Sequence, residues 1–229
     1  MGISIDDWRG NTAVYTAVIT DYEHLGGHIY QDGVDYLFFT DGASYPIESM
    51  WQVHELKDFK HMNPRRLSKF PKHVPHMFPE LLKYKYTIWI DGDMQIVNPN
   101  FIGEILSFLD NGMVISPHFD NRICAYGEAS IRPLKYVNEP MDPQVDFYKS
   151  RGFPSDYGLY ETGVIARDMT NPQAKELGMR WYIHNMVLSY QDQVSLPFVM
   201  WEMDYTPSIL PKSFRDFNWV HINAHKRED

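Results

Sequence analysis

The chain has 229 residues, of which 44% are hydrophobic, and its 30 acidic and 21 basic residues give a formal net charge of −9. This length suits one domain with a full core, and we expect a single domain over residues 1–229, because no proline-, glycine- or serine-rich tract marks a linker. The negative charge argues against a broad surface for nucleic acid or anionic lipid. Any bound phosphate must therefore be held locally, by a metal ion or a few converging cations.

The cysteine count and the hydropathy pattern bear on compartment. Cys124 is the single cysteine, so no disulfide can form within the chain. The first residues lack both a basic and an apolar region, and no apolar run reaches the length of a membrane-spanning helix. These features predict a soluble, cytoplasmic chain with no signal peptide and no transmembrane segment.

Strand-like and helix-like patterns alternate along the chain. Residues 12–20, 35–40 and 51–53 are predicted as strands, and a helix is expected to begin at Asn63 and to end or kink at Pro71. Further on, strands are predicted at 86–90, 112–116 and 162–166, and helices at 98–109 and 171–188. This alternation indicates an α/β domain with a mainly parallel sheet, in which ligands bind beyond the carboxyl ends of the strands.

Two acidic residues, Asp91 and Asp93, flank Gly92 directly after the predicted strand at 86–90. Glycine lets the backbone approach a ligand closely, and two carboxylates supply the hard oxygen ligands that Mg²⁺ or Mn²⁺ prefers. An ordinary Asp-Gly turn explains the spacing on its own equally well. Two charges at the end of a buried strand are costly unless something compensates them, and this favours a cation site.

Basic residues recur at three-residue steps in the predicted helix that begins at Asn63. Arg66, Lys69 and Lys72 would then share one helix face. Such a face is either a phosphate-binding stripe or simply a solvated basic surface. Near the C-terminus, His221 and His225 are four residues apart, and they either bind Mn²⁺ beside the carboxylate pair or belong to a polar tail.

The motifs, taken together, resemble known glycosyltransferases. Residues 86–96 resemble the strand and Asp-x-Asp signature of GT-A fold enzymes, which bind nucleotide sugars through a divalent metal. From about residue 12 to 202 the chain is similar to the glycosyltransferase-like domain of plant cell-wall-associated proteins and bacterial polysaccharide gene clusters. The similarity rests on residues 13–20, 35–41, 75–79, 122–128, 152–154, 161–163 and 191–193, and on Arg66, Lys69, Lys72 and His118. Residues 161–165, 192–193 and 221–226 are also similar in order to the retaining family 8 that includes glycogenin.

The resemblance implies a GT-A (Rossmann-like) fold with a mixed, mainly parallel sheet flanked by helices. It also implies transfer of a hexose from a UDP-sugar to a hydroxyl acceptor, with Mn²⁺ or Mg²⁺ as cofactor. Its implied metal ligands are Asp91, Asp93 and His221, with His225 as the second histidine candidate. The implied donor contacts are Thr16, Ala17, Tyr22, Asp41, Arg66, Lys69, Gly92, Gly163 and Gln193, in addition to the acid pair.

Two further carboxylates, Asp192 and Glu161, are the candidates for catalysis. One of them would act as a base on the acceptor hydroxyl or lie close to the anomeric carbon, and Asp192 would otherwise bind the donor sugar. A structural salt bridge is the competing interpretation for Glu161. The alternatives for the whole chain are a metal-dependent phosphate hydrolase or nucleotidyltransferase, which also place paired acids after a strand, and a carbohydrate-binding protein with an inactive site.

Overall fold

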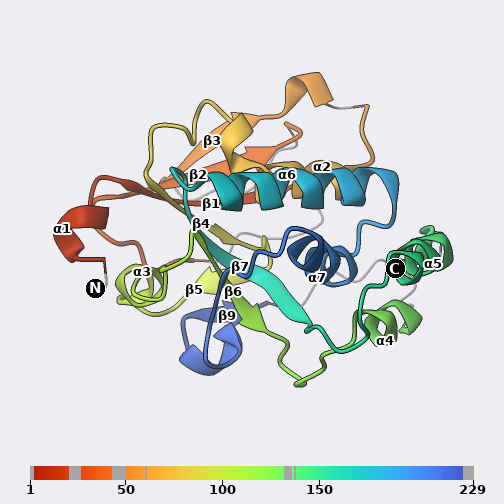
Figure 1. Cartoon of the computed structure of the whole chain (residues 1–229). Helices are drawn as coiled ribbons and strands as arrows, with labels where there is room; N and C mark the ends of the chain where they lie inside the picture. Colours follow the sequence, from red (N-terminus) through yellow and green to blue (C-terminus); the bar gives the residue numbers. More distant parts are fainter. Residues whose placement is uncertain are drawn as a thin grey trace.

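A seven-stranded mixed sheet forms the centre of the molecule (Figure 1). The structure is a computed structural model that describes residues 3–20, 27–42, 50–59, 61–131, 136 and 138–223. The strand order is β3-β2-β1-β4-β7-β6-β8, and β5 pairs separately with β9. The strands are β1 Thr12–Val18, β2 Val34–Thr40, β3 Trp51–Glu55, β4 Tyr86–Ile90, β5 Met94–Ile96, β6 Met113–Pro117, β7 Tyr160–Asp168, β8 Ser208–Ile209 and β9 Val220–Ile222.

The pairing pattern confirms the predicted sheet type. Strands β1 to β4 pair in parallel through β3-β2, β2-β1 and β1-β4, and β6 pairs in parallel with β8. Strand β7 lies between β4 and β6 and is antiparallel to both. The amino end of β7 therefore lies at the same sheet edge as the carboxyl ends of the parallel strands. The result is the mixed, mainly parallel GT-A-like sheet that the resemblance implied.

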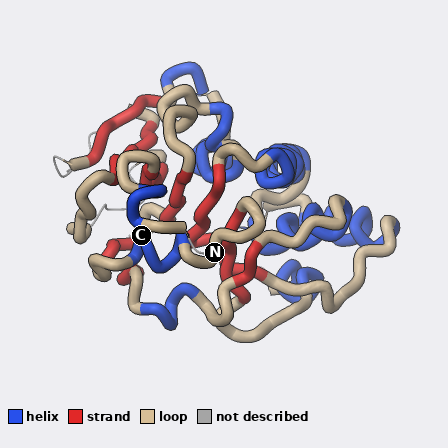
Figure 2. The backbone as a smooth tube through the Cα atoms, turned by 60° about the vertical axis from the view of Figure 1, so that its left-hand side comes forward, coloured by secondary structure: helices blue, strands red, loops and turns tan. Residues whose placement is uncertain are grey.

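Helices cover both faces of the sheet, as the two views show together (Figures 1 and 2). Strand β1 is buried on both faces, which explains its mostly apolar sequence. Tyr15 packs in one core with Leu67 and Trp181, whereas Val14 packs in the other with Phe101. The helices are α1 Ile5–Trp8, α2 Pro64–His73, α3 Phe101–Leu106, α4 Ala125–Ser130, α5 Met141–Ser150, α6 Pro172–Val187 and α7 Asp192–Glu202, with 3₁₀ turns η1 Lys57–Phe59, η2 Pro75–Met77 and η4 Phe214–Phe217.

Several helix boundaries differ from the predictions. Helix α2 continues two residues beyond Pro71, because the Val74 N–H still donates to the Phe70 carbonyl at 3.1 Å and closes the last turn. Helix α3 ends at Leu106 instead of reaching residue 109. Helix α7 was not predicted at all. Among the described residues, no helix combines the length and the apolar character needed to cross a bilayer.

A glycine sets the distance between α6 and the end of α2. A Cβ atom added at Gly178 would meet the carbonyl oxygen of His73 well inside van der Waals contact. That neighbour is backbone and cannot rotate away. The two helices can therefore pack this closely only because residue 178 has no side chain, and this packing places His73 beside the start of α7.

We expect Gly178→Ala to lower the free energy of unfolding by about 1 to 3 kcal/mol, because the added methyl group overpacks the α2–α6 contact. Urea denaturation of the purified chain measures this. Gly103→Ala is the matched control, since Gly103 is also helical and its added Cβ would lie 3.8 Å from the Trp8 ring, an ordinary contact. The control should be neutral or stabilising by up to about 1 kcal/mol. Equal stability of the two variants would contradict the packing argument.

Candidate functional site

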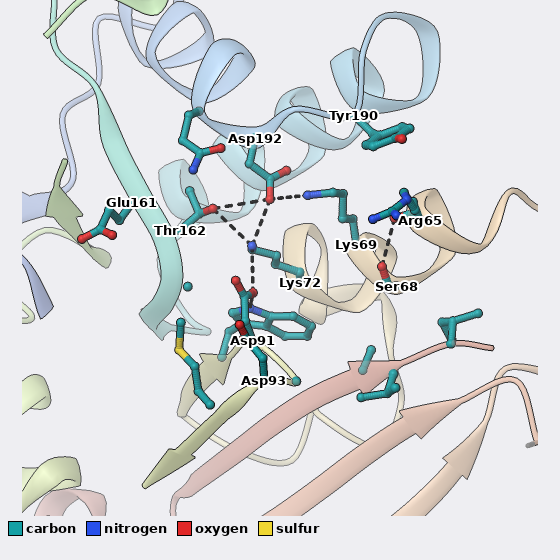
Figure 3. A pocket seen from close by; sticks show the side chains of 18 of the residues that line it. Arg65, Ser68, Lys69, Lys72, Asp91, Asp93, Glu161, Thr162, Tyr190 and Asp192 are labelled. Carbon is teal, nitrogen blue, oxygen red and sulfur yellow. Dashed lines mark hydrogen bonds and ion pairs between the residues drawn. The ribbon is translucent and has the colours of Figure 1, made fainter. Parts of the chain in front are cut away.

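A cavity of about 550 Å³ opens at the carboxyl ends of β1 and β4 (Figure 3). Residues just after β4 form one side of it, and α2 contributes Lys69 and Lys72. The first residues of β7 and of α7 also line it. Because Val164 of β7 is paired with Ile90 at the end of β4, residues 161–163 extend past β4 into the cavity. One antiparallel strand thus brings Glu161, Thr162 and Gly163 to the ligand edge.

The acid pair occupies the turn between β4 and β5. Asp91 and Asp93 both line the cavity, and the turn is fixed by hydrogen bonds from the Asp91 N–H to the Gly163 carbonyl (2.9 Å) and from the Asn223 N–H to the Asp93 carbonyl (2.8 Å). Gly92 lines the cavity between them. The acid pair therefore lies beyond the carboxyl end of β4, where a ligand site was predicted.

The Asp91 carboxylate has one oxygen engaged. Its Oδ1 accepts from the Trp89 indole N–H at 2.7 Å and from the Lys72 ammonium at 3.0 Å. The side chain remains 37% exposed. A Cβ atom at Gly163 would lie 3.4 Å from Oδ2 and would require the terminal methyl group of Met94 to move, which shows how closely β7 packs on the acid pair. The other oxygen of Asp91, Oδ2, has no hydrogen-bond donor among the described residues.

Asp192, the first residue of α7, is a buried carboxylate that collects several donors. The ammonium groups of Lys69 and Lys72 lie 2.5 Å and 2.9 Å from its Oδ2, and the Thr162 hydroxyl is 3.4 Å from the same oxygen. The His73 Nε2 lies 3.0 Å from Oδ1. Figure 3 shows both lysines converging on this carboxylate, with Asp91 on the far side of Lys72.

Asn185 adds a further donor to Asp192. In the amide orientation that satisfies both of its polar atoms, its nitrogen donates to Oδ1 at 3.2 Å and to the Tyr190 carbonyl at 3.1 Å. Both carboxylate oxygens are then hydrogen-bonded within the protein. The arrangement is therefore suited to holding cations in place.

The charges of this network follow from burial and pairing. Burial alone would raise the pKa of Asp192, but Lys69 and Lys72 outweigh it and hold that pKa well below its usual range. Burial also lowers the pKa of Lys69, more than Asp192 raises it. For Lys72 the opposing effects of Asp192 and Asp91 exceed burial, and its pKa is raised. Asp192 is consequently ionised and a weak base, and Lys72 carries its charge between two carboxylates.

The predicted basic stripe is partly wrong. Arg66 does not line the cavity: it donates to Glu139 at 2.8 Å and to the Leu188 carbonyl at 3.1 Å. Arg65 lines the cavity with Lys69 and Lys72 instead. At about 100° per residue, positions six apart lie about 120° apart around the helix, whereas positions seven apart nearly coincide. Three-residue steps drift off one face, so the correct spacing is Arg65, Lys69 and Lys72.

Glu161 lies apart from the Asp192 network, near the start of β7 (Figure 3). It is 4% exposed, and its two oxygens accept from the Ser213 hydroxyl and from the Arg215 Nε, the latter at 2.6 Å. Glu161 and Arg215 both line the cavity. The structure thus contains the salt bridge that was the competing interpretation for Glu161, and a catalytic role for either carboxylate stays a prediction.

The other donor contacts that the resemblance implied line the cavity only in part. Ala17 lines the cavity, but Thr16 is fully buried and its hydroxyl has no hydrogen-bond partner among the described residues. Asp41 is outside the lining and accepts from the Thr20 N–H at 3.1 Å. Tyr22 lies outside the described residues. Gln193 and Gly163 line the cavity as expected.

The structure does not bring His221 to the acid pair. In the antiparallel pair of β5 and β9, Met94 opposes Ile222 and Gln95 opposes His221. Met94 and Ile222 line the cavity, so the alternation of side chains places His221 on the opposite face. Within the described ranges there is no cluster of three or more His, Cys, Asp or Glu residues suited to a metal ion. His225 lies outside those ranges, and metal binding stays a prediction.

Sequence reasoning assigned no role to Thr162, Tyr190 or Arg215, all of which line the cavity. Thr162 lies on a strand whose direction the sequence pattern did not reveal. Arg215 belongs to the short turn η4, between two strands of two or three residues each, where no periodic signal exists. An antiparallel assignment of β7 would have identified Thr162.

The buried His73 predicts a pH-dependent stability. Burial lowers its pKa to about 4, against the opposing effect of Asp192, whereas an unfolded histidine titrates near 6.5. The unfolded chain therefore binds this proton first as the pH falls, so stability is complete above 6.5 and declines toward pH 4. We expect His73→Gln to reduce the loss of unfolding free energy between pH 7 and 4.5 by about 2 to 3 kcal/mol.

Urea denaturation at several pH values measures this slope, which is independent of any constant destabilisation in the variant. His76, whose pKa burial also lowers to about 4, contributes its own share and remains in both proteins. The exposed His61→Gln variant serves as the control and should keep the wild-type slope. An unchanged slope in His73→Gln would show that His73 is not buried as described.

Comparison with known proteins identifies the family of the chain. Residues 43–227 match the family described as TOD1/MUCI70, glycosyltransferase-like domain. The chain is also 35% identical over 162 residues to the "Probable hexosyltransferase MUCI70" of Arabidopsis thaliana, an alignment that covers 66% of this chain and 27% of that protein. The chain thus spans little more than a quarter of that relative's length. The protein belongs to the TOD1/MUCI70 glycosyltransferase-like domain family.

Proposed function

We propose that this chain is a metal-dependent glycosyltransferase that transfers a hexose from a UDP-sugar to a hydroxyl acceptor. The observation that carries the proposal is the cavity at the ligand edge, where the Asp91 and Asp93 pair lies next to the Lys72 and Lys69 ammonium groups. Acids and cations side by side suit a diphosphate and its counter-ion. The "probable hexosyltransferase" name of the relative supports the same class of reaction.

The acid pair fits a divalent cation that takes its other ligands from the substrate. Asp91 keeps Oδ2 without a donor among the described residues, and Asp93 lies two residues away in the same cavity wall. Mg²⁺ and Mn²⁺ are commonly bound by one or two carboxylates together with substrate phosphates. When bound, the cation supplies neutralisation of the charge that develops on the departing diphosphate. His221 stays outside this ligand set in the proposal, because its side chain lies on the face of β9 opposite the cavity.

The protein's own cations would assist at the same place. Lys72 is held between Asp91 and Asp192, and Lys69 is held by Asp192 from the other side. Ammonium groups fixed in advance stabilise developing negative charge without having to reorganise during the reaction. We therefore assign Asp192 as a positioning residue that orients both lysines. Its depressed pKa supports this role over that of a general base.

We expect Asp91→Ala and Asp93→Ala to abolish turnover and the metal-dependent part of UDP binding while the fold is retained. Isothermal titration of UDP, first with Mn²⁺ and then with EDTA, measures binding, and circular dichroism measures the fold. The wild type should bind UDP at least about ten-fold more tightly with Mn²⁺. Asp156→Ala, an exposed acid outside the cavity, is the matched control and should behave as wild type.

Activity and binding together separate the proposal from its alternatives. Full activity in both acid-pair variants would contradict the metal site. Release of inorganic phosphate or of free sugar without an acceptor would favour a metal-dependent phosphate hydrolase. Carbohydrate binding without any nucleotide affinity would favour a carbohydrate-binding protein with an inactive site.

A second prediction concerns Lys72 alone. Lys72→Met removes the ammonium group that faces Asp91, so we expect UDP to bind about ten-fold more weakly, in Mn²⁺ and in EDTA alike. Uridine lacks the diphosphate, and its affinity should not change. Lys83→Met is the control, because Lys83 is exposed and lies 3.8 Å from Asp35, outside the cavity lining. Parallel losses for UDP and uridine would mean that Lys72 shapes the cavity without contacting phosphate.

A further inference from the structure

One wall of the cavity, around Arg215, takes no part in the proposed binding of the diphosphate. Arg215, from η4, lines this wall together with Phe214 and Glu161. The acid pair and the two lysines lie on other elements, after β4 and on α2. Residues 17–20, at the end of β1, form a further part of the lining. Arg215 is therefore a lining residue that takes no part in the proposed phosphate contacts.

The guanidinium of Arg215 is fixed but has unused donors. Glu161, itself buried, holds it through Nε at 2.6 Å, and the rings of Phe119 and Phe214 lie 4.9 Å and 5.4 Å from its central carbon. Within the part of the chain that the structure describes, no residue accepts a hydrogen bond from either Nη atom of Arg215. The side chain is 43% exposed. The two Nη atoms of a lining residue thus have no acceptor among the described residues, while Glu161 holds the guanidinium through Nε.

Phe119 extends this wall beyond the cavity. Its ring contacts Arg215 on one hand and His118 on the other, at a centroid distance of 4.6 Å, yet the residue remains 50% exposed. Phe119 is not part of the cavity lining, so it continues the surface outward from Arg215. An exposed aromatic ring held beside a fixed polar fork suits a ligand with both C–H faces and hydroxyl groups.

We propose that Arg215 and Phe119 form a subsite for the acceptor carbohydrate. Hydroxyl oxygens of a pyranose unit accept from the two Nη atoms of Arg215, and the exposed part of the Phe119 ring packs against sugar C–H groups. This inference rests on the proposed function, because it takes the acid pair and the two lysines as the donor site. A neutral ligand fits better than an anionic one, since Glu161 already compensates the guanidinium charge.

The test uses variants that change the recognition but keep the packing. Arg215→Lys preserves the charge beside Glu161 but removes the planar fork, and Phe119→Leu preserves an apolar side chain but removes the ring. Arg180→Lys is the matched control: Arg180 is also 43% exposed and donates through Nε to Glu176 at 2.7 Å, on α6 and outside the cavity lining. The probes are cellotetraose, β-1,4-galactotetraose and trigalacturonate, titrated by saturation-transfer NMR with and without UDP and Mn²⁺.

We expect at least one neutral tetraose to bind the wild type. Its affinity should fall about ten-fold in Arg215→Lys and in Phe119→Leu, should stay unchanged in Arg180→Lys, and UDP affinity should be the same in all four proteins. Failure of both neutral tetraoses to bind would overturn the inference, as would equal binding by the variants or binding of trigalacturonate alone. A wild type that binds a tetraose through these residues but never UDP would instead overturn the proposed donor and leave the subsite supported.

Discussion

The buried charge of Asp192 is the constraint on which the rest of the site depends. A carboxylate that leaves water costs several kcal/mol unless cations and donors compensate it. Here Lys69, Lys72 and His73 of α2 supply that compensation to the first residue of α7. Lys72 also contacts Asp91 after β4. One ion network therefore fixes two helices and the acid-pair turn relative to one another, and the cavity has its shape because these charges must be satisfied together.

The single antiparallel strand is the second constraint. In an all-parallel sheet only carboxyl ends would meet at the ligand edge, but β7 brings its amino end there. Thr162 thereby reaches Asp192 and Glu161 reaches Arg215. At Gly163 this strand lies close to Asp91, since an added Cβ atom would be 3.4 Å from Oδ2. The carboxyl ends of β1 and β4 and the amino end of β7 thus meet at one cavity.

Local patterns predicted the parts of this arrangement that local physics controls. The strand before the acid pair is buried on both faces, so its continuous apolar run was a sufficient signal. Helix α7 was not predicted, because residues 194–200 are buried on every side, so no amphipathic pattern marks a helix, and because they include Pro197. Arg66 was misplaced because three-residue steps drift around a helix. The orientation of His221 depends on pairing with β5, far away in sequence, which no local pattern reports.

The distribution of charge explains how an acidic chain can attract a diphosphate. The long-range field of a protein with net charge −9 repels anions, so capture depends on groups within contact distance. Asp192 holds Lys69 and Lys72 and Glu161 holds Arg215, while in the acid pair Asp91 shares Lys72 and keeps Oδ2 without a donor among the described residues. A divalent cation bound there would reverse the local sign, because it is the largest charge in such a site. In the proposed function, affinity for the diphosphate would then be set by the metal and the two lysines, and hardly by the surface charge of the protein.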